Sequence, residues 1–308
     1  DANQIDRDMA NMLNHANSVK YEVDNEFFDF AERLIYFNDK RGEAKKWDEL
    51  NEMKKLFMSR GNDSRGTMAV AKFYRKRGEA FSVDASVDFR GRVYHRGLLT
   101  PTKGEAIRPF LNTARSVAVN PDVVEELQTQ IGALVGSPLD TLTVKGRLKA
   151  FKDQEKNLLE IGELMMSKTQ PDRRIKEFLS NPLVAATEDV EVGKLARLAL
   201  EYTRLYNHME GKVPTNKAKY NPEQLQLLGQ FRTKMMIEND ASSSGAQVIS
   251  LSTGDRASAE LSNVLQTSKK QRLYDEIAKR TVDDAEFLAI PELQDLDLDW
   301  TDLMKAAK

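Results

Sequence analysis

The spacing of apolar side chains along the chain predicts a mostly helical fold. Residues 1 to 60 carry two apolar faces at helical spacing, one made of Val23, Phe27, Phe28, Phe30, Leu34 and Ile35, the other of Trp47, Leu50, Met53 and Phe57. Another helix is expected to end near Lys76. Residues 105 to 235 are also mainly helical in pattern, with breaks at Xaa-Pro pairs such as Asn120-Pro121 and Asn221-Pro222.

Two stretches have the pattern of strands. Phe81, Val83, Ala85 and Val87 alternate with polar or small residues, which predicts one strand over this segment. The apolar run from Met235 to Ile237 predicts a short buried strand that stops before Asp240. The expected fold class is therefore mixed α+β, mostly helical.

Composition narrows the possible chemistry. The 308 residues include 46 Lys and Arg against 48 Asp and Glu, so any nucleic-acid site must be a local basic patch. The chain contains no cysteine, which excludes disulfides, thiolate catalysis and Cys-ligated zinc. Its three histidines lie far apart in the sequence. No apolar run approaches membrane-spanning length and no signal peptide is visible, so we expect a soluble, cytoplasmic protein without a membrane partner.

The segment from Lys234 to Gln247 has the strongest candidate chemistry. Asp240 follows the predicted strand, and the six residues from Ala241 to Ala246 are all small. A carboxylate at a strand end, beside a backbone with no bulky side chains, suits a hard divalent cation held against a phosphate. Taken alone, this spacing favours a Ser-rich turn with a helix-capping Asp.

A second candidate follows the strand predicted at residues 81 to 87. Arg90 and Arg92 flank Gly91, and this arrangement can grip a nucleic-acid backbone because Arg bridges phosphate oxygens and Gly permits close approach. Many surface loops contain the same tripeptide. A basic run precedes it, formed by Lys72, Arg75, Lys76 and Arg77. Such a run is usually a solvated helix face.

Together these stretches resemble the single-subunit, phage- and mitochondrial-type DNA-directed RNA polymerases. Asp88-Phe89-Arg90-Gly91-Arg92-Val93-Tyr94 is similar to that family's T/DxxGR motif, and the segment from Asp240 to Gln247 is similar to its motif A. Residues 108 to 114 resemble the family's basic segment between these motifs. Glu201-Tyr202, Lys20 to Asp24 and the segment from Val264 to Lys279 are similar to further family segments, so the resemblance extends discontinuously from about 18 to 280.

The sequence also departs from the family. Ala241 replaces the usual Gly of motif A, and Val248 replaces a frequent His. Motif B, with its Tyr-Gly pair, and motif C, His-Asp-Asp, are absent, and the chain ends about where the motif B helix would start. We therefore expect one subunit of a split, heterodimeric phage enzyme, whose second chain carries motifs B and C. A proteolysed single chain would leave the same sequence.

The resemblance implies a right-hand polymerase fragment with a small antiparallel palm sheet, contributed by residues near 80 to 100 and 233 to 240. The regions it implies are 1–80, helical and thumb-like; 81–115, palm with the DxxGR motif; 116–230, a helical palm insertion; 231–258, palm with motif A; and 259–308, the start of the fingers.

The same resemblance implies the site residues. Asp240 would be catalytic and would bind two Mg²⁺ ions, one of them also held by the Ala241 carbonyl, and the second carboxylate would come from the partner chain. The residues expected to contact nucleic acid are Arg90, Gly91, Arg92, Tyr94 and Arg108. Motif A would be supported by Ser242, Ser244, Gly245 and Gln247.

The expected partners are a DNA template, nascent RNA, ribonucleotides and the second subunit, in the cytoplasm of a bacterial host if the chain is of phage origin. No large promoter-binding domain precedes the motifs, so an accessory promoter-opening factor is also expected. Two other classes stay open. One is a non-catalytic nucleic-acid-binding phage protein that uses only the basic loop. The other is a DNA polymerase or reverse transcriptase, which shares the palm carboxylate but not the DxxGR segment.

Overall fold

The computed structural model describes residues 2–36, 63–87, 93–101, 107–136, 142–187, 191–236, 254 and 256–261. The chain divides into two compact units, one of residues 1–139 and 144–237 and one of residues 140–143 and 238–308. Among the described elements, only helix α12 (Arg256–Leu261) belongs to the second unit. The first unit contains both sheets and the remaining described helices.

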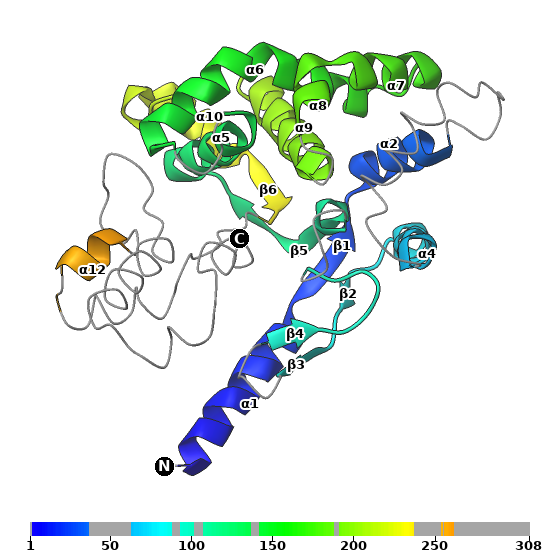
Figure 1. Ribbon diagram of the computed structural model, residues 1–308, viewed down its shortest axis with the longest axis vertical. Helices are drawn as coiled ribbons and strands as arrows, with labels where there is room; N and C mark the ends of the chain where they lie inside the picture. The colour runs from blue at the N-terminus through cyan, green and yellow to red at the C-terminus, as the bar shows by residue number, and fades with distance from the viewer. Residues whose placement is uncertain are drawn as a thin grey trace, which may run out of the picture. The chain divides into compact units, whose positions relative to one another are not determined.

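Helices make up most of the first unit (Figure 1). They are α1 (Ala2–Ser18), α2 (Asn25–Tyr36), α4 (Asp63–Arg77), α5 (Pro121–Val135), α6 (Val144–Met166), α7 (Pro171–Ser180), α8 (Pro182–Ala186), α9 (Val192–His208) and α10 (Pro222–Gln230), with the short 3-10 helices η1 (Arg108–Phe110) and η4 (Lys217–Lys219). The predicted helix ending near Lys76 is confirmed as α4, and the mainly helical pattern predicted for residues 105 to 235 includes α9, most of whose residues are buried.

Four short strands form one antiparallel sheet in the order β2-β1-β5-β6. They are β1 (Lys20–Val23), β2 (Phe81–Ser82), β5 (Leu111–Ala118) and β6 (Arg232–Met235). Tyr21 of β1 lies opposite Phe81 on one side and Thr113 on the other, and Asn112 of β5 lies opposite Met235. The predicted class, mostly helical with a small antiparallel sheet, is thus confirmed at this level.

Two strands lie in segments whose pattern predicted only helix. β1 is too short to show a clear period of two, although Tyr21 and Val23 are buried as alternating strand residues should be. β5 has an irregular burial pattern because its register with β6 shifts between Asn112 and Val117. Such a bulge breaks the alternation from which a strand is recognised in a sequence.

The single strand predicted over residues 81 to 87 was wrong. The structure places β2 in the main sheet, whereas β3 (Ala85–Val87) pairs with β4 (Val93–His95) in a separate two-stranded sheet. Between Ser82 and Ala85 the chain therefore stops pairing with β1 and starts pairing with β4. The Ala85 N–H donates to Asn17 Oδ1 of α1 at 2.6 Å, and the Arg96 N–H donates to the Asp84 carbonyl at 2.7 Å. The β3–β4 hairpin therefore lies beside α1 (Figure 1).

The predicted breaks at prolines mark the starts of four helices, α5, α7, α8 and α10. Pro suits the first helical turn because its missing N–H would have no partner there. Asn120, Asn181 and Asn221 precede three of these prolines, and each side chain accepts a hydrogen bond from a backbone N–H of the first turn. Asn221 and Gln224 complete a reciprocal capping box.

Close helix packing forms one side of the core. Helix α6 packs against both α5 and α9, with a glycine at each crossing. A Cβ at Gly132 of α5 would lie 1.9 Å from the Arg147 carbonyl oxygen, and one at Gly162 of α6 would lie 2.0 Å from Thr203 Oγ1. Only hydrogen in place of a side chain lets these backbones approach so closely.

Candidate functional site

Most residues predicted to bind metal or nucleic acid lie outside the described residues. These are Arg90, Gly91, Arg92, Asp240, Ala241, Ser242, Ser244, Gly245 and Gln247. Their roles stay predictions. Tyr94 and Arg108 lie within the described part of the chain, and the structure shows how each is positioned.

Tyr94 is the central residue of β4. It pairs with Ser86 of β3, and its side chain is 41% exposed. Arg96 Nε donates a hydrogen bond to Ser86 Oγ at 3.2 Å. Val87 and Val93 are paired, so residues 88 to 92, which contain the predicted phosphate-gripping arginines, connect two paired strands. The β3–β4 pair thus carries a partly exposed aromatic side chain two residues after Arg92 in the sequence.

Arg108 begins η1, whose position is fixed by buried aromatic rings. Phe110, which is 1% exposed, meets Phe27 of α2 edge to face with ring centroids 5.0 Å apart. The Phe110 carbonyl accepts a hydrogen bond from the Asp24 N–H at 2.9 Å. Because β5 follows η1 directly and runs antiparallel to β6, Arg108 lies at the end of β5 that is beside the last residue of β6.

Asp24 is the centre of a buried polar network. It directly follows β1, and its Oδ1 accepts a hydrogen bond from the Phe27 N–H at 2.9 Å, which caps the N-terminus of α2. Arg204 of α9 donates to both carboxylate oxygens, at 2.9 and 3.1 Å. Arg197 lies 3.2 Å from Oδ2, and Asn112 Nδ2 donates to the same oxygen at 3.2 Å. The Asp24 side chain is only 3% exposed.

The network continues from α9 into β5 and β6. Arg197 donates to Asn112 Oδ1 at 2.6 Å and to Glu201 Oε2 at 3.2 Å. Arg204 also donates to Glu201 Oε2, at 3.0 Å, and Thr233 of β6 donates to the other oxygen of Glu201 at 2.5 Å. We call Asp24, Asn112, Arg197, Glu201, Arg204 and Thr233 the Asp24 network. It ties α9 to strands β5 and β6 and to Asp24, the residue that joins β1 to α2.

The charges in this network compensate one another. Burial by itself would raise the pKa of Asp24, but the positive charges of Arg197 and Arg204 and the hydrogen bonds it accepts outweigh burial and hold that pKa well below its usual range. Burial would likewise lower the pKa of Arg204, yet its hydrogen bonds and ion pairs with Asp24 and Glu201 raise it above the ordinary value. Both side chains are therefore charged at neutral pH.

The Asp24 network does not fit a divalent cation. The carboxylates of Asp24 and Glu201 are each paired with two arginines, so a metal ion would have to displace existing positive charge. Among the described residues no group of three or more His, Asp or Glu side chains could hold a metal ion. The network positions secondary structure, and the predicted metal ligands are other residues.

Sequence reasoning did not single out Arg197, Arg204, Asn112 or Thr233. A signal was present for the first two, because Arg197, Glu201 and Arg204 share one face of a helix whose other positions are mostly apolar. Charges of opposite sign spaced in this way on a buried helix indicate an internal ion network. Asn112 lies in the segment of residues 108 to 114 that resembles the family, but neither it nor Thr233 shows a charge pattern of this kind, since their partners are distant in the sequence.

No protein-family model and no curated protein matches this chain. None of the helices in the described ranges is long and apolar enough to span a lipid bilayer.

Proposed function

We propose that this chain is one subunit of a DNA-directed RNA polymerase that resembles the single-subunit, phage- and mitochondrial-type family, and that a second chain carrying motifs B and C completes it. The observation that carries the proposal is the order and spacing in the sequence of two motifs, Asp88 to Tyr94 and Asp240 to Gln247. Either motif alone has a plain structural interpretation, and their joint occurrence favours nucleotidyl transfer.

The described fold supports this proposal through segments that are distant in the sequence. Lys20 to Asp24, residues 108 to 114 and Glu201-Tyr202 each resemble a separate family segment. In the structure they meet, because Asp24, Asn112 and Glu201 are all members of the Asp24 network. β6 ends five residues before Asp240. The strand that leads toward the proposed catalytic carboxylate is therefore held by this network through Thr233.

In the proposed mechanism Asp240 and the Ala241 carbonyl supply hard oxygen ligands for Mg²⁺, which would stabilise the charge of an in-line phosphoryl transfer when bound. Arg90 and Arg92 bind the backbone of the template–product hybrid, with Gly91 allowing close approach, and Arg108 adds a further backbone contact. One carboxylate is too few for a two-metal site. The second carboxylate and the groups that grip and select the nucleotide belong to the partner chain.

The test is to isolate the chain with whatever binds it and to assay RNA synthesis. Native mass spectrometry should give a one-to-one complex with a second chain that contains Tyr-Gly and His-Asp-Asp. That complex should extend RNA on a DNA template with ribonucleotides and Mg²⁺. Preference for deoxyribonucleotides would indicate a DNA polymerase or reverse transcriptase instead. Nucleic-acid binding without synthesis, indifferent to Mg²⁺, would indicate the non-catalytic class.

A further inference from the structure

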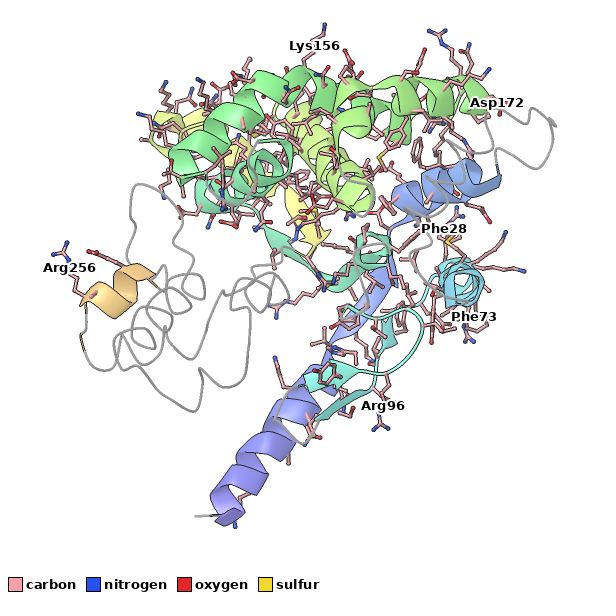
Figure 2. All side chains as sticks on the ribbon, in the orientation of Figure 1. Phe28, Phe73, Arg96, Lys156, Asp172 and Arg256 are labelled. Carbon is pink, nitrogen blue, oxygen red and sulfur yellow. The ribbon has the colours of Figure 1, made fainter. Side chains whose placement is uncertain are left out.

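The last two turns of α4 carry an exposed aromatic ring. Phe73 is 54% exposed, more than any other large hydrophobic side chain among the described residues, and Figure 2 shows it projecting from α4. Its ring meets Tyr74 edge to face with centroids 5.4 Å apart, and Tyr74 stacks on Phe81 of β2 at 4.0 Å. Phe73 is thus oriented by a neighbouring ring while much of its own surface stays accessible.

Two cations lie on the same helix face. Lys76 and Arg77 follow Phe73 by three and four residues, the spacing that places side chains together on a helix. The Arg77 guanidinium lies 5.5 Å from the Phe73 ring centroid. Lys76 is exposed and makes no ion pair within the described part of the chain. Arg77 pairs with Glu79, but both side chains are more than half exposed, and such pairs contribute little and exchange readily.

A structural cause accounts for only part of this surface. Cations in the last turn of a helix are favoured by the helix dipole, so Lys76 and Arg77 need no further reason. An accessible phenylalanine one turn before them gains nothing from the dipole and leaves apolar area in water. One turn earlier, Ala69 is exposed and small, which leaves room beside the ring. Aromatic rings flanked by cations are the elements from which single-stranded nucleic-acid sites are built.

We propose that the α4 surface, formed by Ala69, Phe73, Lys76 and Arg77, binds single-stranded nucleic acid. An unpaired base stacks on Phe73, and the adjoining phosphates bind Lys76 and Arg77. A single strand is the occupant because a base within a duplex is already stacked and does not offer its face to a side chain. This inference goes beyond the proposed function, since the surface contains neither the DxxGR motif nor Asp240.

The test is fluorescence anisotropy of the full 308-residue chain with labelled single-stranded polyuridine, with labelled duplex DNA as a second probe. Phe73→Ala should raise the Kd for the single strand roughly tenfold, the loss typical of one stacked base. Phe73→Tyr keeps an aromatic face and should change the Kd little. Lys76→Gln should weaken binding and reduce the slope of log K against log salt by about 0.7, as for one lost phosphate contact on a single strand.

The matched control is Lys156→Gln on α6, an exposed lysine on another helix (Figure 2). It should leave the Kd unchanged. The proposal is overturned if wild-type protein does not bind the single strand, if Phe73→Ala binds as wild type does, or if Lys156→Gln weakens binding as much as Lys76→Gln. Asp240→Ala should not affect this binding, so the α4 surface and the proposed catalytic role succeed or fail separately.

Discussion

Arg204 holds Asp24 through two parallel hydrogen bonds, from Nη1 to Oδ2 at 2.9 Å and from Nη2 to Oδ1 at 3.1 Å. The two residues are 180 positions apart in the sequence. This paired geometry matches the planar guanidinium to the planar carboxylate and fixes both orientation and distance. It joins α9 to the end of β1 and to the first turn of α2, so the sheet and the helical core share one buried connection.

Replacing Asp24 should therefore be strongly destabilising. Asp24→Asn keeps the shape of the side chain but removes one of the two buried carboxylates that Arg197 and Arg204 share, leaving only that of Glu201. We expect the free energy of unfolding, measured by urea titration, to fall by about 3–5 kcal/mol. The control is Glu177→Gln, which removes the exposed i,i+4 pair with Arg173 on α7 and should cost less than about 1 kcal/mol. Equal effects of the two substitutions would contradict the role assigned to Asp24.

The same ion pair predicts an acid-dependent contribution to stability. The pKa of Asp24 is lower in the folded protein than its ordinary value of 3.8, so ionised Asp24 favours folding above that pH. This contribution is lost as the pH falls below about 4 toward the folded-state pKa. The difference in unfolding free energy between wild type and Asp24→Asn should therefore shrink on acidification below about pH 4. A difference independent of pH in this range would contradict the assignment.

The connection from α9 to β6 can be tested at Thr233. Thr233→Val removes the hydroxyl that donates to the buried Glu201 carboxylate while keeping the side-chain volume. Leaving a buried carboxylate oxygen without its donor should cost about 1.5–3 kcal/mol in unfolding free energy. Thr233→Ser keeps the hydroxyl and should retain more stability, although it loses a buried methyl group. A serine variant less stable than the valine variant would show that packing, rather than the hydrogen bond, is decisive.

The helix crossings give an independent test of the fold. A Cβ at Gly162 would lie 2.0 Å from Thr203 Oγ1 and 2.8 Å from the Ala199 carbonyl oxygen, so Gly162→Ala should destabilise the protein by about 1–3 kcal/mol. Gly229 lies in α10 with no atom within 4 Å of the corresponding Cβ position. Gly229→Ala should stabilise the protein by about 0.5–1 kcal/mol, because Ala favours the helix. Thermal unfolding of both variants measures the contrast.

Features set by neighbouring residues were predictable from the sequence. The helices beginning at Pro121, Pro171, Pro182 and Pro222 follow from proline and capping chemistry within one turn. Helix α9 follows from its apolar periodicity. The division of residues 81 to 87 between two sheets could not be predicted in this way. It involves a contact distant in the sequence, in which Asn17 of α1 accepts a hydrogen bond from the Ala85 N–H.

The candidate site likewise has features that could be predicted from neighbouring residues and features that could not. Residue type and spacing predict its chemical motifs at Arg90 to Arg92 and at Asp240, which lie outside the described residues and stay predictions. The Asp24 network was not predicted, because Asp24, Asn112 and Thr233 are distant from α9 in the sequence and meet it only in the folded chain. The two arginines on the buried face of α9 indicate that an acidic side chain lies opposite them. Periodicity alone does not show which part of the chain provides that side chain.

The proposed function depends most directly on Asp240. The decisive measurement is RNA synthesis by the complex of this chain with its partner, in which Asp240→Ala is compared with wild type and with Asp255→Ala, the same chemical change at another position. Native mass spectrometry of each complex controls for assembly. We predict that Asp240→Ala assembles normally and makes no RNA, whereas Asp255→Ala remains active. RNA synthesis by an assembled Asp240→Ala complex would contradict the catalytic assignment.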